Sequence, residues 1–192
     1  MSAPWWYLRR AVPWVALLGC CAAAVVIAAA IARWPSTTAG LLPAVLGCCA
    51  AGGAFVFDED AAPVTTVTPR ARWRLAVRCG AALVPLTVWS AIVLLRPGDV
   101  PVQRDGWWLM GAALVLAAVG TAGVASRLDR SAPGSLVAAL VVLAVFAPLV
   151  VGSLLGWSSP YPVDGLTAGV RTFWLCVAGG GLLACVATLR PA

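Results

Sequence analysis

The chain has 192 residues, of which 62% are apolar and only 10% are charged. A water-soluble domain carries about a quarter charged residues, so this composition excludes a soluble globular protein and indicates a chain surrounded by lipid. The net charge is +6, and the arginines that produce it lie in short segments beside apolar runs. That placement is typical of a membrane protein and argues against nucleic acid as a partner.

Six apolar runs predict six transmembrane helices, because each has about the 20 residues needed to cross a hydrocarbon core of roughly 30 Å. In chain order, the predicted spans cover residues 11–32, 39–57, 75–95, 107–125, 135–155 and 172–189. Arg9 and Arg10 before the first run give it the outline of a signal peptide, but the run is longer than a signal peptide needs. We therefore predict an all-α polytopic membrane protein whose residues 1–192 form a single transmembrane domain.

The distribution of arginine predicts the direction of the chain through the membrane. With the N-terminus in the cytoplasm, nine arginines lie on the inner side and four on the outer side. The inner arginines are Arg9, Arg10, Arg70, Arg72, Arg74, Arg78, Arg127, Arg130 and Arg190. The outer arginines are Arg33, Arg96, Arg104 and Arg171. Cytoplasmic loops of membrane proteins hold an excess of basic residues. We therefore expect the protein to lie in the plasma membrane with both of its termini in the cytoplasm.

Tryptophan supports the predicted depth of the spans. Nearly all tryptophans fall at span ends, where aromatic side chains anchor helices among the lipid headgroups. Trp34, Trp107, Trp108, Trp157 and Trp174 fall at outer ends. Trp89 lies deeper, in the third span, and we expect it to be a packing residue.

The spans lack the groups that membrane enzymes and ion-coupled pumps require. The chain contains no histidine, and no Asp or Glu falls inside a predicted span. This pattern excludes His-ligated haem or metal and argues against a transporter with its own ion-coupling site. No nucleotide-binding motif is present, so a partner would have to hydrolyse any ATP that is used. We assign no catalytic residue and no cofactor.

Two cysteine pairs, Cys20–Cys21 and Cys48–Cys49, fall near the middle of the first two spans. Four thiols at one depth could bind a soft metal such as Cu(I). Adjacent residues on a helix point about 100° apart, however, so one helix does not easily present both thiols to one ion. We expect these cysteines to be small apolar fillers and assign no metal site.

The segment at 58–74, between the second and third spans, is the strongest functional candidate. It begins with acidic residues and ends with basic residues and a tryptophan, and the candidate docking residues are Asp58, Glu59, Asp60, Arg70, Arg72, Trp73 and Arg74. Retention of the loop in the cytoplasm would by itself explain the arginines. The alternative is a docking surface for a cytoplasmic partner, because charged rims favour oriented encounter.

The connection before the sixth span, residues 156–171, also has an unusual composition. Pro160, Tyr161, Pro162 and Gly165 favour a structured turn or a short re-entrant piece over a plain linker.

Together these features resemble the membrane (permease) subunit of a type-2 ATP-binding-cassette transporter, of the small kind found in actinobacteria. The resemblance rests on six spans, the initial WWYLRR, the stretch from DED to TPRARWR at 58–74, and the connection at 156–170. It implies a coupling helix at 58–74 that docks on a separate cytoplasmic ATPase subunit. It also implies a second membrane subunit, identical or not, which completes the pore for a hydrophobic substrate.

A non-catalytic structural or assembly subunit of a larger membrane complex is the alternative. Such a subunit also needs no buried charge and would use small residues for close helix contacts. Gly47, Gly52 and Gly53 in the second span and residues 179–181 in the sixth are candidates for such contacts.

Overall fold

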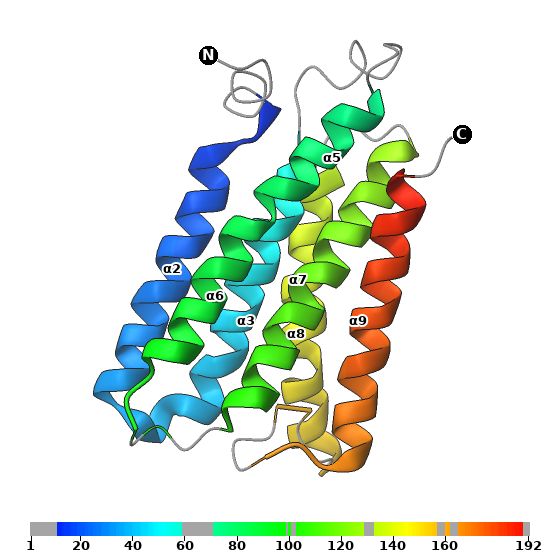
Figure 1. Cartoon of the computed structure of the whole chain (residues 1–192). Coiled ribbons are helices and arrows are strands. Elements are labelled where there is room, and N and C mark those ends of the chain that lie inside the picture. The colour runs from blue at the N-terminus through cyan, green and yellow to red at the C-terminus, as the bar shows by residue number, and fades with distance from the viewer. Residues whose placement is uncertain are drawn as a thin grey trace.

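The computed structural model describes residues 11–58, 71–98, 100, 103–128, 133–156, 160–161 and 165–189, with the backbone alone at 71–75. All regular secondary structure in these residues is helical, and the helices form one bundle (Figure 1). In chain order, the elements are α2 (Trp14–Arg33), η1 (Pro35–Thr37), α3 (Thr38–Ala54), η2 (Phe55–Phe57), α5 (Ala71–Ala81), α6 (Leu83–Leu95), α7 (Arg104–Arg127), α8 (Pro133–Leu155) and α9 (Ala168–Leu189).

Within the described ranges, six helical segments are long and apolar enough to cross a membrane. They are Trp14–Arg33, Pro35–Phe57, Ala76–Leu95, Arg104–Arg127, Pro133–Leu155 and Ala168–Leu189. The predicted fold class is therefore confirmed. Helix α2 begins and helix α9 ends at the same end of the bundle, which also holds α5 (Figure 1). We call this end the termini end.

The third span is divided between α5 and α6 by a turn at Ala82. Pro85 explains the break, because proline has no N–H to donate to the carbonyl of Ala81, four residues earlier. The sixth helix begins at Ala168, four residues before the predicted start of the span. Arg171 is exposed in its first turn and donates its backbone N–H to Thr167 O at 2.9 Å, so its charge does not end the helix.

Helices α3 and α7 form the centre of the bundle. In the spans that contain them, 72% and 56% of the most apolar window is buried inside the protein, against 33% or less in the other four. Helix α3 packs against α2, α7 and α8, while α9 packs chiefly on α7. The outer helices α8 and α9 expose large leucines, such as Leu143 and Leu183, as expected for surfaces that face lipid.

Glycine allows α7 and α9 to meet backbone to backbone. A Cβ atom on Gly181 would lie 2.6 Å from Ala117 N, and one on Gly120 would lie 2.5 Å from Gly181 O. The neighbouring Gly179 and Gly180 have nothing within 4 Å of such an atom. Of the three consecutive glycines, only Gly181 therefore makes the close helix contact expected from small residues in membranes.

Trp89 lies where α6 crosses α7, and its side chain is 0% exposed. A Cβ atom on Gly111 of α7 would overlap the indole ring of Trp89. The ring also packs against that of Trp107, with 6.0 Å between the centroids. The prediction that Trp89 is a packing residue is confirmed.

Candidate functional site

Part of the predicted docking segment can be located at the termini end of the bundle. Asp58 follows η2 directly. The backbones of Arg72, Trp73 and Arg74 lie in the first turn of α5. The remaining candidates, Glu59, Asp60 and Arg70, lie outside the described residues. Helix α5 itself is far less apolar than the other helices of the bundle.

The carboxylate of Asp58 binds the start of α8. It accepts the backbone N–H of Gly134 at 2.6 Å through Oδ1 and that of Ser135 at 2.9 Å through Oδ2. The first N–H groups of a helix have no partner within the helix and carry its positive dipole end, so a carboxylate there is favourable. Asp58 therefore has a structural role that its place in the acidic cluster did not indicate. Pro133, at the first position of α8, does signal the helix start, but nothing in the sequence connects it to Asp58.

Helix α5 is held against the bundle by its second half. Arg78 is only 5% exposed, in the first turn of the predicted third span. The helix contacts η2 and α9 as well as α6. Asp58, at the start of the 58–74 segment, thus meets α8, and α5, whose first four residues end that segment, contacts α9 as a whole helix.

The cysteines at mid-depth are free thiols. Cys21 and Cys49 are buried, and Cys20 and Cys48 are partly buried. In the described part of the chain, no three His, Cys, Asp or Glu side chains are arranged to hold a metal ion.

At the opposite end of the bundle, the connection before α9 is anchored by two aromatic side chains. The Tyr161 hydroxyl donates to Val145 O at 3.0 Å, and the Trp174 Nε1 donates to Pro160 O at 3.1 Å. Their rings pack with centroids 5.8 Å apart. Burial raises the pKa of Tyr161 to about 12, so its hydroxyl stays protonated well into the alkaline range. Pro160 and Tyr161 of the predicted structured turn are thus hydrogen-bonded to neighbouring helices, whereas Pro162 lies outside the described residues.

The aromatic-belt prediction is wrong for two tryptophans. Trp174 and Trp107 are only 2% and 3% exposed, because they pack inside the protein and not among headgroups. Trp34 and Trp108, at the same end, are 58% and 53% exposed, as the prediction requires. Position near a span end gives the depth of a side chain but not the direction in which it points.

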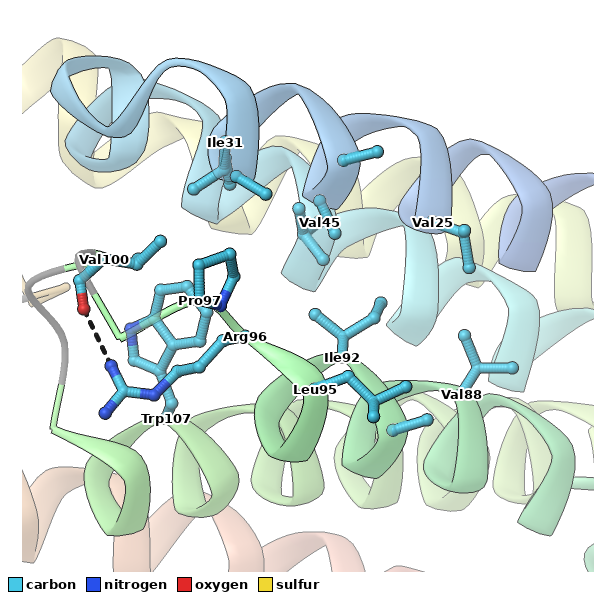
Figure 2. Close-up of a pocket in the computed structure, with 14 residues that line it drawn as sticks. Val25, Ile31, Val45, Val88, Ile92, Leu95, Arg96, Pro97, Val100 and Trp107 are labelled. Carbon is cyan, nitrogen blue, oxygen red and sulfur yellow. Dashed lines mark hydrogen bonds between the residues drawn. The ribbon is translucent and has the colours of Figure 1, made fainter.

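An apolar cleft of about 320 Å³ opens between α2 and α6 in the half of the bundle away from the termini (Figure 2). One wall comes from α2, including Val25, Ala28 and Ile31, and the other from α6, including Val88, Ile92 and Leu95. Its volume is about twice that of an apolar cavity of roughly 150 Å³ that accommodates benzene.

Polar hydrogen-bond donors gather at one end of this cleft. The Arg96 guanidinium donates through Nη1 to Val100 O at 2.8 Å (Figure 2). Two further buried donors, Arg96 Nε and Trp107 Nε1, have no acceptor within the described part of the chain. Buried donors without acceptors are rare and costly. Both atoms expose less than 1 Å² of surface, whereas Arg96 as a residue is partly exposed and places a positive charge at this end of the cleft.

Comparisons of the chain with protein-family models, curated proteins and solved structures give no match. The described residues offer two features on which a function can be based. One is the 58–74 segment, which is bound to α8 through Asp58 and leads into α5 at the termini end, and the other is the apolar cleft at the opposite end.

Proposed function

We propose that this chain is the permease subunit of an ATP-driven exporter in the plasma membrane, coupled through residues 58–74 to a separate cytoplasmic ATPase. The observation that supports this proposal is the attachment of Asp58, at the start of that segment, to α8, together with the continuation of the segment into α5, which contacts α9. Asp58 is hydrogen-bonded to the start of α8, and α5 lies against α9. A partner that displaced the segment would therefore act on both helices.

The attachment suits a coupling element because it is short and direct. The hydrogen bonds from Gly134 and Ser135 to Asp58 would transmit a displacement of the segment to α8 without an intervening flexible residue. Helix α5 continues into the third span through the turn at Ala82, so the same displacement would also tilt α6. Binding of ATP to the partner would then shift the bundle between inward-open and outward-open arrangements.

The composition of the spans favours an external energy source. In the described spans, the one acidic residue is Asp105, which is exposed in the first turn of α7. A carrier driven by protons or sodium ions normally keeps an ionisable group within the bundle. The energy for transport of a substrate would therefore come from a partner that binds and hydrolyses ATP.

The experiment is to purify the chain with the ATPase encoded or expressed beside it and to measure ATP hydrolysis by the complex. We expect the triple variant Arg70→Gln, Arg72→Gln, Arg74→Gln to lose bound ATPase, and with it the hydrolysis, by about tenfold or more. The matched control neutralises Arg33, Arg104 and Arg171 at the opposite end of the bundle and should retain both. If both triple variants hydrolyse ATP as the wild type does, the coupling role of the segment is wrong.

A structural subunit of a larger membrane complex is the second candidate. Gly179 and Gly180 favour it, because both are exposed on α9 with nothing within 4 Å of a Cβ position. Small residues on a lipid-facing surface allow another transmembrane helix to approach closely. Recovery of only integral membrane partners, with no ATPase activity in the purified complex, would favour this function over the exporter.

A further inference from the structure

The cleft between α2 and α6 has a long apolar part and a short polar end. From Val88 to Leu95 the α6 wall extends over eight residues, or about 10 Å at the rise of an α-helix. Arg96 follows directly, at the end of α6. Figure 2 shows Arg96 beside Trp107 at one end of the cleft and Val88 beside Val25 at the other.

The cleft is open toward the lipid. Its rim includes Leu95, which is 82% exposed, and Val25, which is 50% exposed. Its floor is formed by Val45 and Trp107, which are 1% and 3% exposed. Small side chains such as Ala28 on α2 keep the space between the two helices unfilled. The apolar walls give water no partners along this length, so a hydrocarbon chain is the suitable occupant.

A plain hydrocarbon does not complement the polar end of the cleft, where a positive charge lies. Arg96 carries a positive charge, and its Nε, like Trp107 Nε1, is a buried donor with no acceptor among the described residues. Arg96 lies where α6 ends, at the level of the bundle where lipid headgroups are expected. Guanidinium groups bind phosphate oxygens strongly, because the hydrogen bonds are charge-assisted. Along the cleft, the positive charge of Arg96 lies at the headgroup level and the apolar walls lie deeper in the membrane. The phosphate and acyl chains of a lipid in the adjacent leaflet follow the same order.

We propose that the cleft binds one anionic phospholipid, with an acyl chain between α2 and α6 and its phosphate at Arg96. The site lies at the opposite end of the bundle from the 58–74 segment and does not depend on coupling to an ATPase. Its occupant fills the space that the alanines leave open and pairs its phosphate with the positive charge of Arg96. A zwitterionic lipid with the same chains binds less tightly, because its headgroup carries no net charge to pair with Arg96.

The test uses the full chain in a non-ionic detergent and counts bound lipid by native mass spectrometry. The probes are phosphatidylglycerol, phosphatidylcholine with identical acyl chains, and glycerol phosphate without chains. We expect one phosphatidylglycerol per chain and about fivefold weaker binding of phosphatidylcholine. Arg96→Gln should weaken phosphatidylglycerol binding about fivefold, whereas Arg104→Gln, a change of an exposed arginine at the same end, should not.

A second pair of variants tests the hydrocarbon part. Ala28→Leu fills the cleft and should lower phosphatidylglycerol binding at least fivefold, while Ala139→Leu on the exposed face of α8 should leave it unchanged. Ala91→Leu, on the α6 wall, repeats the test if Ala28→Leu does not fold. Equal binding of the two lipids overturns the proposal, as does binding of glycerol phosphate as tight as that of the lipid. Unchanged lipid binding in the folded cleft-filling variants also overturns it.

Discussion

The carboxylate of Asp58 joins two helices that are distant in the sequence. Gly134 and Ser135, which donate to it, are 76 and 77 residues further along the chain. Gly134 is also required for the approach, because a Cβ atom there would lie 2.5 Å from Ala54 O and 2.8 Å from Asp58 Oδ1. A single side chain and one glycine therefore fix the end of α3 to the start of α8.

We expect Asp58→Ala to destabilise the protein by about 1 kcal/mol, the usual loss when a capping side chain is removed from a helix N-terminus. The reason is that two backbone N–H groups of α8 lose their acceptor. Thermal unfolding of the purified chain in detergent measures the change. Asp105→Ala, which removes an exposed acid from the first turn of α7, is the control and should cost less than half as much. Equal losses in the two variants would contradict the capping role.

The prediction that Trp89 is a packing residue is confirmed by its burial, although depth alone does not distinguish it from a lipid-facing side chain such as Leu143. The burial of Trp107 and Trp174 depends on which way each side chain points around its helix, and an alanine-rich sequence contains little periodic pattern to show that. The α2–α6 cleft was missed for the same reason, since alanines that line it are not distinguishable in the sequence from alanines that fill other contacts.

At the scale of the helices, the three consecutive glycines of α9 offer a direct comparison. They occupy residues 179–181 on one turn, yet they have different surroundings. Gly181 meets the backbone of Ala117, while Gly179 and Gly180 point into open space. The contact between α7 and α9 therefore depends on one side of α9 alone.

We expect Gly181→Ala to destabilise the protein by about 1–3 kcal/mol, because the added methyl group would force the helices apart. Gly180→Ala should be neutral or slightly stabilising, because alanine favours the helix and nothing within 4 Å opposes it. Chemical unfolding of both variants in mixed micelles measures the difference. A Gly181→Ala variant as stable as the wild type would show that the two helices do not meet as described.

Hydropathy was sufficient to predict the helices, and the differences have local causes. Each span was located to within a few residues, because about 20 apolar residues in a row have few alternatives to a transmembrane helix. Helix α9 begins four residues before the predicted span, because Arg171 interrupts the apolar run but remains exposed in the first turn of the helix. The break at Ala82 was also missed, although Pro85 was its signal.

At the scale of the whole molecule, six spans place the start of α2 and the end of α9 on the same side of the bundle (Figure 1). The arginine distribution predicts that this side faces the cytoplasm. We expect alkaline phosphatase fused after Ala192 to be inactive and the same enzyme fused after Gly98, at the opposite end, to be active. Phosphatase activity in intact cells is the measurement. The reverse pattern would contradict the predicted orientation and would place residues 58–74 outside the cell.

The contact of α7 with α9 through Gly120 and Gly181 also has a mechanical consequence. Two backbones that touch have little room to slide or rotate, because interlocked atoms must separate before either helix moves. Helices α2 and α6, by contrast, are separated by the cleft in the half of the bundle away from the termini. We therefore expect α2 and α6 to move apart more easily than other helix pairs when the bundle changes conformation. Helices α7 and α9 should move together as one rigid unit.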